Sequence, residues 1–449
     1  MIGKDKLFSL LGSEIKKSPA EQTEVVYIGN SHGLTRYANS YIHQNVYDSS
    51  SMIYFRAVIG RRMGVSSTTS MEKEDLNRAL LTAYNIAMNQ RDNPAFEGLP
   101  QPEDYPKIRT HFEQTAKFTP KDRAEKAKIL FNAAKKHNLT VAGKFATGES
   151  EIAVMNSNGV EAYQSATSAD VNVIVMGDDS SGYSEAISRK VNDLSFKKLA
   201  DTAIRKCMDS AKPQEIPPGK YNVILEPKAV AELVEWMNYT GFGAQSMDEG
   251  TSFLCGRSGK KIMGDNISIY DDGLDEDGMP FPFDFEGVPK KRVFFVKNGV
   301  GGDVLHNSLT ASRNKMKSTG HAMPPGNFES TFSLNTFVKG GRNTLNSMIS
   351  NTERGILVTR FHYVNGMLDT NKALMTGMTR DGTFLIKKGK IAHGIKNMRF
   401  TESMLKAFSR AKMISRERQA IDSWWSAVGC LVAPAILISN FNFSGKTEF

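Results

Sequence analysis

Two proline-rich segments divide this chain of 449 residues and limit how it can fold. The first, at residues 91–120, contains Pro94, Pro100, Pro102, Pro106 and Pro120. The second is AKPQEIPPGK at residues 211–220. Proline has no backbone N–H and restricts the residue before it, so neither a helix nor a central strand continues through such a segment. The chain must therefore fold as separate parts around these two breaks.

The two parts before the second break show the same order of elements: a helix, antiparallel strands and a second helix, at 4–90 and again at 121–210. Leu7, Leu11 and Ile15 share one face of the first helix, and alternating or β-branched runs indicate the strands. Strands are predicted at 23–28, 34–47 and 52–63, and then at 140–147, 150–155, 160–166 and 170–176. This order predicts an internal duplication without obvious residue identity.

From residue 221 onward the sequence is rich in strand patterns. Strands are predicted at 221–225, 267–270, 291–297, 355–363, 383–387, 390–393 and 435–443, with one late helix at 402–411. The fold class expected is α+β, with a two-part N-terminal region of antiparallel sheets and helices followed by a β-rich C-terminal domain. The expected divisions are an N-terminal α+β domain at 1–92, a strap at 93–120, a second α+β layer at 121–212, a linker at 213–220 and the C-terminal domain at 221–449.

Hydropathy and cysteine content predict where in the cell the protein works. Mean hydropathy is −0.36 and no apolar run is long enough for a transmembrane helix, so no membrane association is expected. The N-terminal apolar segment is too short and too interrupted for a signal peptide. Cys207, Cys255 and Cys430 are far apart and form neither a disulfide framework nor a metal knuckle. Reduced thiols and a cytoplasmic location are therefore predicted.

The net charge of +9 favours acidic partners in general. Lys and Arg are scattered, however, and aromatic residues do not alternate with them. No helix-turn-helix, zinc-finger or RNA-recognition pattern is present, so the sequence disfavours nucleic-acid binding.

A predicted strand at 221–225 feeds a helix that carries two carboxylates. Proline at position 227 suits the first turn of that helix, and Glu232 and Glu235 lie on the face opposite the apolar stripe. A zinc hydrolase site on such a helix needs two His one turn apart beside a Glu. No His occurs between His137 and His306. Two solvated carboxylates are therefore the simpler interpretation.

Several phrases in the chain resemble the TldD/PmbA family, whose members were once called modulators of DNA gyrase and are related to metalloproteases. They occur in order along nearly the whole sequence: RYANSYIHQN, TSFLCGRSGKKI, FDFEGVPKKRVFFVKNGV, STFSLNTF, GILVTRFHYVNGMLDTNKALMTGMTRDGTFLIKKGKI and PAILISNFNFSG. The chain is identified as a member of this family.

The resemblance also implies which kind of member this is. TldD-like chains carry His-Glu-x-x-x-His on the helix after the first C-terminal strand, and a downstream Cys completes their metal site. TldE/PmbA-like chains lack these ligands and pair with a TldD-like chain. The corresponding window here runs from Ala231 to Trp236 and keeps only Glu232. The resemblance therefore implies a vestigial motif at Ala231, Glu232, Glu235 and Trp236, with no catalytic residue and no metal on this chain, and with zinc or a similar divalent metal on a TldD-like partner.

The family's activity implies a role in degrading or processing unfolded peptides. This chain would pair with a TldD-like subunit as a heterodimer, or with itself as a homodimer, and help enclose a peptide cavity. A β-rich domain could hold the peptide by strand addition. Exposed residues of two Pro-containing segments are predicted to line the cavity or the interface: Phe281, Phe283, Phe285, His321, Met323 and Phe328. The alternative is that these segments pack on the core.

Two other functions remain open from the sequence. One is a standalone metallopeptidase with a divergent site, whose ligands would come from Glu232, Glu235, Cys255, His306 and His321. The other is a binding protein for an acidic partner such as DNA or a topoisomerase, whose affinity would fall steeply with salt.

Overall fold

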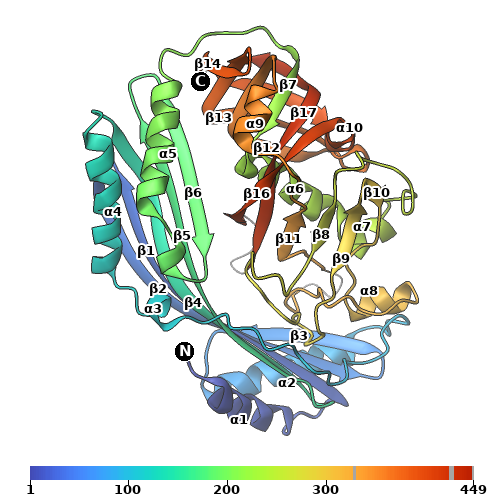
Figure 1. The fold of residues 1–449 in the computed structure, drawn as a ribbon. Helices are drawn as coiled ribbons and strands as arrows, with labels where there is room; N and C mark the ends of the chain where they lie inside the picture. The colour runs from blue at the N-terminus through green and yellow to red at the C-terminus, as the bar shows by residue number, and fades with distance from the viewer. Residues whose placement is uncertain (327–329, 424–428, 447–449) are drawn as a thin grey trace.

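The computed structural model describes residues 1–326, 330–423 and 429–446 and contains two β-sheets (Figure 1). A six-stranded antiparallel sheet, in the order β3-β2-β1-β4-β5-β6, is built from strands between residues 22 and 188. A mixed eleven-stranded sheet is built from strands between residues 219 and 446. The predicted α+β class is confirmed. No helix in these ranges is long and apolar enough to cross a membrane.

The first sheet consists of two copies of one unit. The first copy contains α1 (Lys4–Ile15), β1 (Gln22–Ala38), β2 (Tyr41–Ile59), β3 (Arg62–Thr68) and α2 (Lys73–Asn89). The second contains α4 (Pro120–Lys135), β4 (Thr140–Asn156), β5 (Glu161–Met176), β6 (Ser181–Ser188), η1 (Val191–Asp193) and α5 (Phe196–Asp209). The strap between the copies contains only the short helix α3 (Glu113–Ala116) among its regular elements.

Strand pairing shows that the two copies are offset by 118 residues. Gln22 pairs with Val58 across β1 and β2, and the residues 118 further on, Thr140 and Met176, pair across β4 and β5. Ala57 pairs with Gly64 across β2 and β3, and Val175 pairs with Gly182 across β5 and β6. The central pair β1–β4 joins the copies antiparallel. The duplication expected from element order is therefore present in the register of the sheet.

The two glycines at corresponding places explain how each copy packs its second helix on its edge strand. A Cβ atom on Gly64 would lie 2.1 Å from the carbonyl oxygen of Ala83 in α2. A Cβ atom on Gly182 would lie 2.1 Å from the carbonyl oxygen of Ala203 in α5. Only a residue without a side chain allows the helix backbone to approach the strand this closely.

Replacing Gly182 with alanine is expected to reduce the free energy of unfolding by about 1–3 kcal/mol, because the added methyl group forces helix α5 away from β6. Chemical denaturation followed by circular dichroism measures this change. Gly12→Ala in α1 is the matched control, since its Cβ would meet only the Met155 methyl group at 3.4 Å. Equal stability of both variants would show that the close approach in α5 is not required.

The strand boundaries in this region differ from the predicted ones. The strand expected at 34–47 is interrupted by a turn at Asn39 and Ser40, whose φ angles are 49° and 59°. The turn separates β1 from β2. Strand propensity does not predict it, and the one local signal is Asn39, because Asn tolerates the left-handed region of backbone conformation. In contrast, the breaks expected near residues 148 and 168 are absent, and β4 and β5 each continue as one long strand.

The C-terminal sheet is organised around β17 (Cys430–Lys446), which pairs with β7, β11, β15 and β16. Strands β17, β15, β13, β12 and β7 pair in a closed ring. The strands that precede β17 are β7 (Gly219–Leu225), β8 (Ile269–Asp271), β9 (Val293–Lys297), β10 (Val300–Gly301), β11 (Asn335–Val338), β12 (Arg354–Asp369), β13 (Leu374–Lys387), β14 (Lys390–Gly394), β15 (Met398–Ser403) and β16 (Ala411–Asp422). The helices are α6 (Pro227–Gly241), α7 (Ala244–Asp248), α8 (Ser308–Arg313), α9 (Leu345–Ser350), η2 (Thr370–Lys372) and α10 (Met404–Ser409).

The two sheets meet at two junctions. In one, aromatic residues of segment 281–285 pack with Val26 of β1 and with Ile152 and Val154 of β4. A buried ion cluster adjoins them: the Arg56 guanidinium lies 3.3 Å from Glu24 and 3.0 Å from Glu286. The other junction lies between α5, β6 and the N-terminal end of α6 (Figure 1).

Candidate functional site

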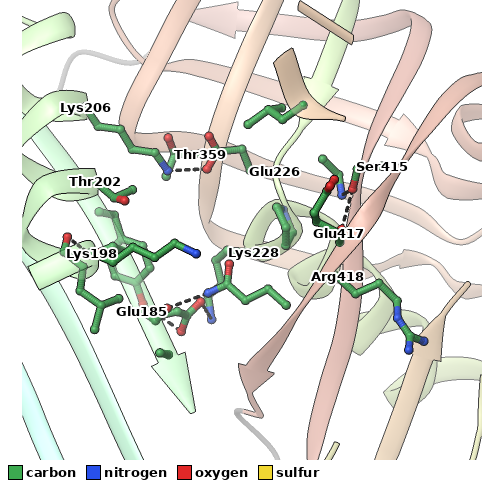
Figure 2. Close-up of a pocket in the computed structure, with 18 of the residues that line it drawn as sticks. Glu185, Lys198, Thr202, Lys206, Glu226, Lys228, Thr359, Ser415, Glu417 and Arg418 are labelled. Atoms are coloured by element: carbon green, nitrogen blue, oxygen red, sulfur yellow. Dashed lines mark hydrogen bonds and ion pairs between the residues drawn. The ribbon is translucent and has the colours of Figure 1, made fainter. Parts of the chain in front are cut away.

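A cavity of about 530 Å³ lies at this second junction, bordered by α5, β6, β16 and the first turn of α6 (Figure 2). Its volume lies in the range of ligand-binding clefts. The Lys198 side chain reaches from α5 into the cavity (Figure 2). Lys206 and Glu226 form an ion pair across it, so the wall carries both charge signs.

Helix α6 directly follows β7, as the sequence predicted. Pro227 occupies the first turn of the helix, where its missing N–H leaves no bond unmade. The apolar stripe of Val230, Leu233 and Met237 is fully buried in the core of the C-terminal domain. The expected solvated face does not exist, because Glu232 and Glu235 are each only 7% exposed. The prediction of solvated carboxylates was wrong, because β12 and β16 cover the face that an isolated helix would expose.

Glu232 has a structural partner on β12. Its carboxylate accepts a hydrogen bond from the backbone N–H of Phe361 at 2.7 Å. Burial raises the pKa of Glu232 to about 7, although Lys228 and Arg360 oppose that rise. The Phe361 N–H lies beyond Val358, the last residue of β12 that pairs with β7. Glu232 therefore satisfies a backbone group at a strand edge.

Two cations surround Glu232 and connect the sheets. The Lys228 ammonium lies 3.4 Å from the Glu185 carboxylate on β6. Arg360 forms an ion pair with Asp381, and its guanidinium carbon lies 4.6 Å from the centre of the Tyr183 ring on β6. This network places positive charge beside Glu232, the one residue that the sequence resemblance matches to the family motif.

The positions where TldD-like chains are expected to carry His are occupied by packing residues. Ala231 is 1% exposed and belongs to the core cluster. The Trp236 ring lies against Gly366, where an added Cβ would come within 2.8 Å of the ring. Glu235 accepts a hydrogen bond from the Ser423 hydroxyl at 2.6 Å. Within the described residues, no three His, Cys, Asp or Glu side chains gather to hold a metal ion. The residues around Glu232 do not fit a metal, because two cations already neutralise the carboxylates there.

The other candidate ligands lie in separate surroundings. His321 is buried and is hydrogen-bonded to Asp271 at 2.8 Å and to Thr319 at 3.0 Å. Burial lowers the pKa of His321. Cys255 lies beside Met247 and Cys430 is buried beside Asn335. His306 is buried, and burial lowers its pKa as well.

The predicted lining residues are mostly core residues. Phe281, Phe283 and Phe285 are between 1% and 4% exposed and form part of the first junction, and His321 is 1% exposed. Their predicted exposure was wrong, because the six-stranded sheet covers the segment that carries the three Phe residues. Met323 is partly buried against the same cluster, and Phe328 lies outside the described residues.

Sequence reasoning missed the cations of this site. Lys228 stands four residues before Glu232, a spacing that brings two side chains together on a helix and could have signalled the contact. Glu185, Tyr183 and Arg360 come from distant strands, and no local pattern connects them to α6.

Comparison with known proteins shows the family of the chain. The family model described as the PmbA/TldA metallopeptidase C-terminal domain matches residues 218–445, and the one described as its central domain matches residues 116–210. The chain belongs to the PmbA/TldA metallopeptidase family. An uncharacterized protein of Methanocaldococcus jannaschii is 25% identical over 298 residues, which is 63% of this chain and 64% of that protein's length. The metalloprotease TldD homolog of Buchnera aphidicola (Acyrthosiphon pisum) is 23% identical over 84% of this chain and 81% of its own length.

Solved structures share the PmbA/TldA fold over nearly the whole chain. TldE from Thermococcus kodakarensis superposes with a TM-score of 0.87 at 19% identity, covering 97% of this chain and all of the other. A putative modulator of a DNA gyrase from Thermotoga maritima superposes with a TM-score of 0.84 at 18% identity, covering 98% of each chain. At these identities the likeness concerns the fold.

Proposed function

We propose that this chain is a TldE/PmbA-like subunit that binds no catalytic metal and pairs with a TldD-like metalloprotease subunit acting on unfolded peptides. The observation that carries the proposal is the state of the motif helix. Ala231 and Trp236 pack where the two His would stand, and Glu232 is engaged by the Phe361 N–H between two cations. A carboxylate held in this way cannot activate water, because a general base needs a polarised water within reach.

The cavity beside α6 supports a role in holding peptide. It opens between parts of the chain that are far apart in sequence, and its wall offers both charged groups and strand backbone. In this role the chain would supply part of an enclosure, and the partner would supply the zinc or similar divalent metal. Three free cysteines agree with work in a reducing compartment such as the cytoplasm.

Metal content tests the proposal directly. The purified chain alone is expected to contain close to no zinc, and its complex with a co-expressed TldD-like chain of the same genome close to one metal per heterodimer, with peptidase activity. Glu232→Gln in this chain is expected to leave the activity of the complex within about twofold, because the group makes no transition-state contact. The matched change, Glu→Gln in the motif of the TldD-like chain, is expected to abolish activity. One tightly held metal and peptidase activity in the chain alone would favour a standalone enzyme.

A further inference from the structure

The two copies within the six-stranded sheet differ at the outer edge of their long middle strands, β2 and β5. In the second copy, β6 pairs with β5 only from Ala169 onward. In the first copy, β3 pairs with β2 only from Ile53 onward. Each copy thus leaves part of a strand without a neighbouring strand: residues 161–168 of β5 and residues 41–52 of β2.

The chain covers the edge of β5 with its own strap. The backbone N–H of Thr167 donates to the carbonyl oxygen of Thr110 at 3.0 Å. The Thr110 hydroxyl donates to the carbonyl oxygen of Ser165 at 2.7 Å, and the Phe112 N–H donates to the Thr167 hydroxyl at 3.2 Å. An extended segment without regular structure therefore satisfies this edge.

In the part of the chain that the structure describes, no such strap covers the corresponding edge of β2; at the end of this edge the Ser51 hydroxyl donates to the carbonyl oxygen of Thr69 at 3.1 Å. Subtracting the 118-residue offset places Tyr47 and Ser49 where Ser165 and Thr167 stand, so their backbone groups face outward in the same way. In the described ranges, β2 pairs with β1 on one side, and on the other side it pairs with β3 only beyond Met52. The segment that follows α5, the counterpart of the strap, instead runs to the C-terminal domain, where the Gln214 N–H donates to Gly394. The first copy thus lacks the segment that would close its edge.

The side chains of this edge lack the usual protection against pairing. All residues from 43 to 50 are exposed, including Val46 and Tyr47, and Tyr47 is 70% exposed. Segment 41–52 contains a single formal charge, Asp48, and neither Lys nor Pro. Free edges are normally guarded by such residues, so an unguarded edge of this length indicates a docking site.

We propose that the β2 edge, residues 41–52, receives an extended strand of the TldD-like partner subunit. This inference rests on the proposed function. The strap on β5 indicates the conformation of the occupant. The β5 edge corresponds to the β2 edge, and extended backbone of the strap covers it. A second copy would bring another net charge of +9 to the interface, and this repulsion disfavours a second copy as the occupant.

The test uses the full chain and a co-expressed TldD-like chain, with affinity measured by sedimentation velocity. Ser49→Pro removes an outward N–H, and Tyr47→Lys adds a guarding charge. Both leave the backbone bonds to β1 in place, and Ser49→Pro also removes the hydroxyl that is hydrogen-bonded to Ser31 of β1 at 3.2 Å. Each is expected to weaken the heterodimer about tenfold or more, Ser49→Pro through one lost backbone hydrogen bond and Tyr47→Lys through the charge that it places on the edge. Leu81→Lys is the matched control, an exposed apolar residue (42%) on α2, and is expected to leave the affinity unchanged. Backbone amides of residues 45–51 are expected to exchange at least tenfold more slowly in the complex.

The outcomes separate the two proposals. If the wild-type chains pair but both edge variants bind as tightly as Leu81→Lys, and amides 45–51 stay unprotected, the edge assignment is overturned while the pairing stands. If Ser49→Pro abolishes self-association without affecting the heterodimer, the occupant is a second copy and the assignment is likewise overturned. If the wild-type chains do not associate, the proposed function is overturned along with the edge assignment.

Discussion

Replacing Arg56 with methionine is expected to lower the free energy of unfolding by about 3–5 kcal/mol at pH 8, because it leaves buried carboxylates without their cation. Arg56 is 4% exposed and forms ion pairs with Glu24 and Glu286 at the junction of the two sheets. Asp284, whose carboxylate accepts from the Ala322 N–H at 2.8 Å, adds a third acidic group. Arg56 thus lies among three buried carboxyls, and its loss removes the cation that pairs with both Glu24 and Glu286.

The sign of the pH dependence follows from the raised pKa values in this cluster. Burial, reinforced by Glu286 and Asp284 and opposed by Arg56, raises the pKa of Glu24 from 4.5 to about 8. Burial, together with Glu286, raises the pKa of Asp284 to about 7. The folded chain therefore binds more protons than the unfolded chain between about pH 4.5 and 8, so this cluster's contribution to stability falls as pH rises through that window.

Urea denaturation of wild type and Arg56→Met from pH 5 to pH 9 measures both effects. The deficit of the variant is expected to be smallest at pH 5, where Glu24 and Asp284 are neutral. Glu24→Gln is the control that keeps Arg56 and Glu286, and it should be more stable than wild type at pH 9 and flatten the pH profile. A deficit for Arg56→Met below 1 kcal/mol at pH 8 would contradict the account of this junction.

Replacing Lys228 with methionine is expected to cost about 3–5 kcal/mol of stability at pH 8, since it removes the cation between Glu185 and Glu232. Burial lowers the pKa of Lys228, but the surrounding carboxylates, Glu185 and Glu232 first among them, together raise it by more than burial lowers it. The net shift is upward, so the ammonium stays charged in the folded chain. The deficit should shrink at pH 5, because the pKa of Glu232 is about 7 and the group is neutral there.

Thermal unfolding at pH 5 and pH 8 distinguishes this role from simple packing. Lys228→Arg keeps the charge and is expected to retain most of the stability, whereas the double variant Lys228→Met with Glu232→Gln should recover part of it at pH 8. If Lys228→Met lowers stability equally at both pH values and Glu232→Gln recovers none, the loss comes from packing, and the cation has no special role at the motif helix.

The sequence by itself determined the local elements and the family. Apolar spacing located α1 and α6, the proline-rich segments marked the strap and linker, and ordered phrases along the chain identified the PmbA/TldA relationship. These features are local: a helix stripe repeats every three or four residues, and a proline breaks structure wherever it stands. The absence of His from the window between Ala231 and Trp236 was equally visible in the sequence.

Only the tertiary structure decided what surrounds the remaining residues. Glu232 was expected to be solvated and is buried because β12 covers it, and Phe283 was expected to be exposed and is buried under the first sheet. The contact of Lys228 with Glu185 joins residues 43 positions apart on different elements. The open edge of β2 became visible only when strand registers showed the 118-residue offset and the strap on the equivalent edge. The burial of a side chain and the covering of a strand edge depend on which distant segment packs against them. Local periodicity in a single sequence does not predict such contacts.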